Sequence, residues 1–152
     1  MKSIRNPVVI YVDSLARDFL IASVIKNILE KNGFKVFFVS RLTYIPVLKY
    51  LRPQLFIIIK NFLKNFEDDV VKYLKNSDVF VVDAEGAMTA ERCEFHFKHF
   101  GLDVTKTVGV VKKAFLWNEE FAKFLIDFYG ADKEKLVVSG SPKFSLSRYI
   151  QD

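Results

Sequence analysis

Short apolar runs alternate along the chain with longer stretches in which apolar positions recur every three or four residues. The short runs are rich in β-branched residues and end at turn-forming residues, which is typical of buried strands. This pattern predicts six strands, over residues 8–12, 34–39, 55–59, 79–82, 114–117 and 136–139.

The longer stretches have the spacing of amphipathic helices, which the pattern predicts over residues 15–31, 42–51, 61–75 and 119–129. Gly33 and Gly130 stand where the first and last of these should stop, because glycine commonly ends a helix. Pro46 predicts a kink or a later start in the second helix. Residues 87–112 have no clear period, so a strand and a ragged helix both remain open there.

Alternating strands and helices at this spacing predict a doubly wound α/β fold, a mostly parallel six-stranded Rossmann-like sheet with helices on both faces. The 152 residues fit a single domain. Right-handed crossovers bring the loops after the strands to one edge, and ligands of such sheets bind there. Functional residues are therefore expected in the loops that follow the strands.

Composition narrows the class of protein. The apolar runs are much shorter than the about 18–20 residues that span a bilayer, and no signal-peptide core is present. The single cysteine, Cys93, excludes an internal disulfide and favours a reducing compartment, so we expect a cytoplasmic protein. A net charge of +5 permits an anionic partner, but no basic motif resembles a nucleic-acid reader.

The loop after the first strand, Asp13-Ser-Leu-Ala-Arg17, lacks the glycines that let a backbone approach a pyrophosphate. This makes a nicotinamide or flavin dinucleotide site improbable, and no Walker-type loop occurs elsewhere. Asp13 and Ser14 are most simply helix caps. Arg17 opposes the helix dipole, so we expect it to grip an anionic substrate or to pair with Asp13 or Asp83.

The loop after the fourth strand contains Asp83 and Glu85, followed by Gly86. Two neighbouring carboxylates at this edge suit general base catalysis, because a partly buried neighbour raises the pKa of one of them. Glu85 is the first choice as base and Asp83 the second. The alternative is that Asp83 caps the next helix and Glu85 is solvated. The two carboxylates could also bind a metal, but no third ligand is evident in the sequence.

Two further patterns in the sequence have simple structural explanations. Cys93, His96 and His99 have metal-ligand spacing, but they turn around a helix and no fourth ligand is evident, so packing or solvation is favoured. Cations and aromatics also gather where a membrane surface could bind, although a solvated helix face explains them more simply. These residues are Arg41, Tyr44, Lys49, Tyr50, Arg52, Lys60 and Lys64.

Four segments together resemble the bacterial surface-carbohydrate biosynthesis proteins, GT-B-type glycosyltransferases akin to those that make capsule and lipopolysaccharide. The helix from Ala16-Arg-Asp-Phe to Gly33 resembles the opening helix of that family. Asp83-Ala-Glu-Gly86 is similar to an Asp-Glu-Glu-Gly signature, with Ala84 in place of the middle acid. Phe115-Leu-Trp-Asn-Glu119 resembles a Trp-Gly-Glu segment, with Asn118 in place of glycine. Val137-Val-Ser-Gly-Ser-Pro-Lys-Phe144 is similar to Val-Thr-Gly-Asn-Pro-Arg-Phe-Asp, with Ser145 in place of the acid.

The resemblance implies the N-terminal, acceptor-side half of a GT-B glycosyltransferase, inactive alone because the donor domain is absent. Its partners would be a glycan or glycolipid acceptor and a C-terminal GT-B domain, with peripheral contact with the inner membrane left open. No bound cofactor is expected, and a nucleotide-sugar donor would bind only with the C-terminal domain. Glu85 and Asp83 would be catalytic. The expected substrate-binding residues are Asp13, Arg17, Arg41, Ser141 and Lys143.

Two alternatives to the transferase remain. The chain could be a free-standing binding or regulatory module for a phosphorylated ligand. It could also be half of a sugar-nucleotide epimerase, which shares the GT-B plan. An epimerase should interconvert a free nucleotide sugar without an acceptor, whereas a transferase needs one.

Overall fold

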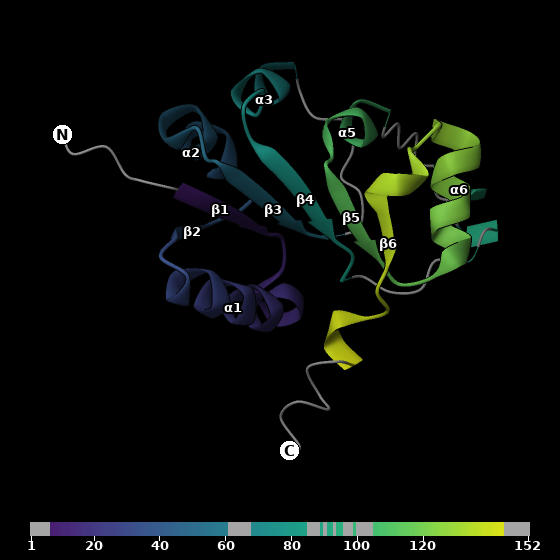
Figure 1. The fold of residues 1–152 in the computed structure, drawn as a ribbon, viewed down its shortest axis with the longest axis horizontal. Helices are drawn as coiled ribbons and strands as arrows, with labels where there is room; N and C mark the ends of the chain where they lie inside the picture. Colours follow the sequence, from purple (N-terminus) through teal and green to yellow (C-terminus); the bar gives the residue numbers. More distant parts are fainter. Residues whose placement is uncertain are drawn as a thin grey trace.

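The six predicted strands form one all-parallel sheet in the order β2-β1-β3-β4-β5-β6, as Figure 1 shows. The computed structural model describes residues 7–60, 68–84, 89, 91–92, 94–95, 99 and 105–144. The strands are β1 (Pro7–Val12), β2 (Lys35–Val39), β3 (Leu55–Ile59), β4 (Asp78–Val82), β5 (Lys113–Leu116) and β6 (Leu136–Val138). Each lies within about one residue of its predicted position, which confirms the doubly wound α/β fold.

The helices follow the predicted order. They are α1 (Leu15–Lys31), α2 (Tyr44–Leu51), α3 (Asp68–Tyr73), α5 (Thr105–Val110) and α6 (Glu119–Tyr129), and a 3-10 turn (Lys133–Lys135) precedes β6. α1 and α6 have the predicted bounds. Pro46 lies in the first turn of α2, where a proline costs no helical hydrogen bond. α5 belongs to the stretch whose pattern was not interpretable.

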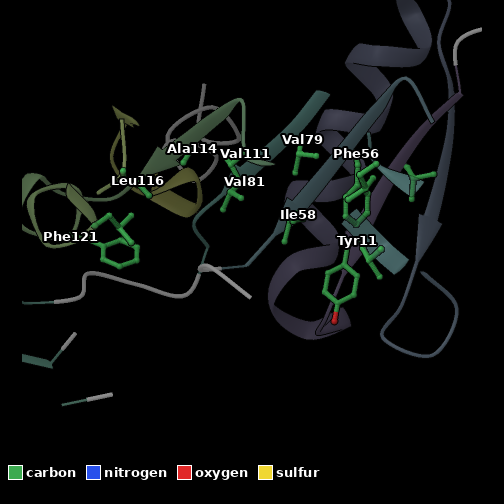
Figure 2. Packing of buried hydrophobic residues seen from close by; sticks show 14 of the residues in the cluster. Tyr11, Phe56, Ile58, Val79, Val81, Val111, Ala114, Leu116 and Phe121 are labelled. Carbon is green, nitrogen blue, oxygen red and sulfur yellow. The ribbon is translucent and has the colours of Figure 1, made fainter. Parts of the chain in front are cut away.

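Two apolar cores lie on opposite faces of the sheet. The larger one packs strand residues such as Val9, Phe56 and Val81 against α2, α3 and α6. Figure 2 shows part of this core, with Tyr11 beside Phe56 and its hydroxyl directed away from that ring. The smaller core packs the alternate strand residues against α1. Covered faces on both sides explain why β3 is apolar at every position.

The described residues cover the two faces unequally. α1 contacts β1, β2 and β3, and it lies on the opposite side of the sheet from α2, α3 and α5 (Figure 1). On the α1 side, Phe80, Val82 and Phe115 remain half-buried. The segment after β6 reaches this side of the sheet (Figure 1). None of the helices in the described residues is long and apolar enough to cross a membrane.

Candidate ligand-binding edge of the sheet

Polar side chains follow the carboxyl ends of neighbouring strands. Asp13 follows β1, Arg41 follows β2, Lys60 follows β3 and Asp83 follows β4. The chain moves outward from β1 to β2 and then returns past β1 to β3, so the direction of winding reverses between β1 and β3. Parallel sheets of this kind form their ligand crevice at that reversal. Asp13 and Lys60 are therefore placed on its two sides.

Asp13 is the centre of an ion-pair network at this crevice. Its Oδ2 accepts a hydrogen bond from Lys60 Nζ at 2.8 Å, and its Oδ1 accepts one from the Tyr11 hydroxyl at 3.1 Å. Arg17 NH2 lies 3.5 Å from Oδ2. The network thus joins the ends of β1 and β3 to the first turn of α1.

These contacts set the protonation states of the Asp13 carboxyl and the Tyr11 phenol. Partial burial alone would raise the pKa of Asp13, but the Lys60 ammonium, the Tyr11 hydroxyl and Arg17 together lower it below its ordinary value. Burial and the adjacent Asp13 carboxylate raise the pKa of the Tyr11 phenol, and the positive charge of Arg41 opposes this only weakly. Asp13 is consequently a carboxylate and Tyr11 a neutral donor across the physiological range.

Asp18 holds the first turn of α1 beneath the network. It is fully buried, and its Oδ2 accepts a hydrogen bond from the Ser14 backbone N–H at 3.0 Å. Arg17 donates to both Asp18 oxygens, from Nε at 2.6 Å and from NH2 at 3.0 Å. Ser14 is the N-cap residue, but its side chain makes no capping hydrogen bond. The expected cap at Asp13 or Ser14 is therefore confirmed in position only: Ser14 is the N-cap residue, but Asp18 accepts from its N–H and Asp13 binds Lys60.

The expectation for Arg17 is confirmed in part. It does pair with Asp13, yet its shortest contact is with Asp18 rather than with Asp83. A guanidinium can serve both acids because its donors point in several directions in one plane. About a quarter of the Arg17 side chain remains exposed. Arg17 therefore fixes the helix start and still reaches the solvent at the edge.

Arg41 lies in a turn after β2 that is closed by hydrogen bonds. The N–H groups of Thr43 and Tyr44 both donate to the Ser40 carbonyl. The Tyr44 ring meets the Tyr11 ring edge-on, with 5.5 Å between ring centroids. Arg41 itself is exposed, and its positive charge acts on the Tyr11 phenol.

Of the two predicted catalytic acids, only Asp83 can be placed. Its residue is 1% exposed, its N–H donates to Phe115 O at 2.9 Å, and its carbonyl accepts from Trp117 Nε1 at 3.0 Å. The Asp83 backbone thus joins β4 to β5, and the residue is buried rather than exposed at the edge. Glu85, the first choice as base, lies outside the described residues.

Ser141 and Lys143 lie after β6. Ser141 is buried, and its Oγ accepts a hydrogen bond from the Lys143 backbone N–H at 3.2 Å, which starts a helical turn. Lys143 is exposed, and the next residue, Phe144, packs on Trp117 with 5.9 Å between ring centroids. Ser141 therefore shapes this segment, whereas Lys143 presents a cation at the edge.

The other patterns singled out from the sequence lie elsewhere. His99 is exposed and stacks on Phe95, while Cys93 and His96 are outside the described residues. The cation and aromatic cluster is divided between two ends of the molecule. Lys49, Tyr50 and Arg52 are at the far end of α2, near the amino ends of the strands, whereas Arg41 and Lys60 are at the carboxyl edge. Lys64 is outside the described residues.

Three members of the network were not among the predicted site residues: Tyr11, Asp18 and Lys60. Tyr11 reads as one more apolar strand residue, and Asp18 as an ordinary acid in a first helical turn. Lys60 had a usable signal, because it directly follows an apolar strand and so must lie at the carboxyl edge.

Comparisons of the chain with protein-family models, with curated proteins and with solved structures find no match in any of the three. The interpretation of the edge therefore depends on its own geometry and on the motifs of the sequence.

Proposed function

We propose that the carboxyl edge of this sheet binds the saccharide acceptor of a glycosyl transfer. The chain would be the acceptor-side domain of a cytoplasmic GT-B-type glycosyltransferase for a surface polysaccharide. The observation that carries the proposal is the Asp13–Lys60–Arg17 network at the point where the winding of the sheet reverses.

The chemistry of this network suits sugar hydroxyls. A hydroxyl both donates and accepts, so it is bound best where a carboxylate stands beside ammonium, guanidinium and phenol donors. Asp13 provides the acceptor, while Lys60, Arg17 and Tyr11 provide donors within one cluster. Charged groups also make stronger hydrogen bonds than neutral ones. Arg41 and Lys143 would add positive charge for an acidic sugar.

Asp13 is poorly suited to remove a proton, because its lowered pKa makes it a weak base. We therefore retain Glu85 as the proposed base that deprotonates the acceptor hydroxyl. Asp83 would act by holding the adjoining strand ends together. The nucleotide-sugar donor would be bound by a C-terminal domain, which agrees with the family that the sequence motifs resemble.

The acceptor site can be tested on this chain alone by saturation-transfer NMR with a panel of neutral and uronic-acid disaccharides. We expect saturation transfer to sugar ring protons with the natural sequence. The Asp13→Asn, Lys60→Gln double variant should bind at least about tenfold more weakly, because it removes hydrogen bonds to charged groups worth about 1.5–3 kcal/mol each.

A matched ion pair is the control. Lys112 and Asp78 also lie 2.8 Å apart, but they join the opposite, amino ends of the strands. The Asp78→Asn, Lys112→Gln variant should bind saccharides as the natural chain does. Equal losses in both variants, or no binding by any saccharide of the panel, would contradict the proposed acceptor site.

The catalytic part needs the chain joined to a C-terminal donor domain. In such a protein, Glu85→Gln should lower kcat with little change in the KM for acceptor, whereas Asp13→Asn should raise that KM. Calorimetry should also detect binding of a nucleotide sugar. An intact protein that binds no nucleotide sugar, and whose activity is unchanged by Glu85→Gln, would refute the transferase assignment.

A further inference from the structure

A cavity of about 320 Å³ lies on the less covered face of the sheet. One wall is α1, through Ile21, Val24 and Ile25, and the floor is Val82 of β4 and Phe115 of β5. The opposite wall is the segment after β6, through Ser139, Gly140 and Pro142. Figure 1 shows α1 and this segment on the same side of the sheet, on either side of that floor.

The lining is almost entirely apolar, and no member of the ion-pair network contributes to it. Water is poorly bound in such a space, because a buried water molecule needs several polar partners for its hydrogen bonds. The half-buried side chains of Val82 and Phe115 would be stabilised by an apolar occupant. The space is bounded on both sides, so the occupant must be slender. A single aliphatic chain meets these conditions, and a whole helix about 10 Å wide does not.

Each wall also carries a cation toward the carboxyl edge, although the Arg17 guanidinium is already paired with Asp13 and Asp18, so the exposed Lys143 provides most of the positive charge. Arg17, Ile21, Val24 and Ile28 recur at intervals of four, three and four, so they share one face of α1. Arg17 is therefore on the same stripe as the cavity lining, at its carboxyl-edge end. On the other wall, exposed Lys143 follows Pro142 directly. An occupant with an aliphatic chain and an anionic head would match both the lining and these charges.

We propose that this cavity takes the aliphatic chain of an amphiphilic acceptor, whose anionic head lies between Arg17 and Lys143. The inference rests on the proposed acceptor function and specifies its substrate class as a lipid-linked saccharide. Isoprenoid and acyl chains share this chemistry. The saccharide portion would extend from the head across the edge to Asp13 and Lys60.

Binding can be followed by the fluorescence of Trp117, the only tryptophan, which packs on Phe144 beside the cavity wall. The probes are alkyl phosphates of increasing length, below their micelle concentrations, with farnesyl phosphate as the isoprenoid arm. Affinity should rise about fourfold for each methylene buried. It should level off near ten carbons, because the cavity holds about ten groups the size of a water molecule. Whichever of farnesyl and dodecyl phosphate binds more tightly identifies the kind of chain.

Val24→Phe would fill the cavity from α1 and should weaken dodecyl phosphate binding about tenfold or more. Ile28→Phe is the matched control, since Ile28 lies on the same stripe outside the lining, and it should bind as the natural chain does. Lys143→Gln tests the head at an exposed position where folding is not at risk. It should weaken dodecyl phosphate binding about two- to fivefold and leave dodecyl maltoside binding unchanged.

Affinity that does not depend on chain length, or that Val24→Phe leaves unchanged in a folded protein, would overturn the inference. Inorganic phosphate binding as tightly as dodecyl phosphate would also overturn it. A natural chain that binds saccharides but no alkyl phosphate would reject the cavity assignment alone. Alkyl phosphate binding by a chain that binds no saccharide would reject the acceptor function and uphold the cavity assignment.

Discussion

Asp18 offers the sharpest test of how the edge is built. It is fully buried in the first turn of α1 and accepts hydrogen bonds from the Ser14 N–H and from two nitrogens of Arg17. Removing it by Asp18→Ala should leave the helix end and the guanidinium without their shared acceptor. We expect a clear loss of stability from this one substitution.

The magnitude follows from the three contacts. Loss of the bond to the Ser14 N–H should cost about 1 kcal/mol, as loss of a helix cap does. The pair with Arg17 should contribute about 1–2 kcal/mol, less than a fully buried pair, because Arg17 can turn to Asp13 or to solvent. The better helix propensity of alanine offsets about 0.5 kcal/mol. The net cost of Asp18→Ala is therefore about 2 kcal/mol.

Urea denaturation followed by far-ultraviolet circular dichroism measures this difference. A double-mutant cycle of Asp18→Ala with Arg17→Met isolates the ion pair and should give a coupling of about 1 kcal/mol. Glu30→Ala, which removes an ion pair with Lys26 at the surface of the same helix, is the control and should cost less than about 0.5 kcal/mol. A cost for Asp18→Ala no larger than that of the control, or a coupling of zero, would refute the account of this turn.

Three further expectations concern single residues. The pKa of Asp13 is lower in the folded chain than in the unfolded chain, where it is about 3.9. The Asp13 carboxylate therefore stabilises the fold above that pH, and this contribution is lost as the pH falls through the folded pKa. The stability difference between the natural chain and Asp13→Asn should therefore shrink during acid titration, and a constant difference would contradict it. The raised pKa of Tyr11 means the reverse, a contribution present below about 10 and lost at higher pH. In an absorbance titration at 295 nm, where tyrosinate absorbs, the Tyr11→Phe variant should absorb less than the natural chain only above a pH of about 10. Asn118 accepts from the Phe121 N–H at the start of α6, so Asn118→Ala should cost about 1 kcal/mol in urea denaturation, and Asn118→Asp much less.

The elements themselves could be predicted because each has a strong local signal. β3 is an unbroken apolar run, and the structure places it between β1 and β4 with both faces covered. α1 has the helical period throughout, and Gly33, with φ of +85°, follows its last turn as predicted. α5 had no such signal, because its described residues, Thr105–Val110, make less than two helical turns. Local pattern therefore determined most of the sheet and the longest helices.

The site was less predictable because its contacts are not local. Lys60 and Asp13 are 47 residues apart, and they meet only because β3 pairs with β1 on the side opposite β2. A different order of the same strands would have separated them. Asp18 illustrates a second limit, because its burial depends on the packing of α1 over β1 and β3. The sequence indicated which edge to inspect, but not which side chains meet there.

The strand order also separates the two loops of this edge in which acids were predicted. Asp13 follows β1 and Asp83 follows β4, with β3 between them. Neighbouring strands are about 4.8 Å apart, so the two loops are separated by about 10 Å. Lys60, at the end of the intervening β3, binds the Asp13 carboxylate and lowers its pKa, and its backbone N–H donates to the Val82 carbonyl just before the second loop. The Asp13 end of the crevice is thus an ionised acceptor of hydrogen bonds. A carboxylate stabilised by an ammonium group is a weak base, so in the proposed transferase Asp13 would bind a saccharide hydroxyl, while the proposed base Glu85 would remove the proton.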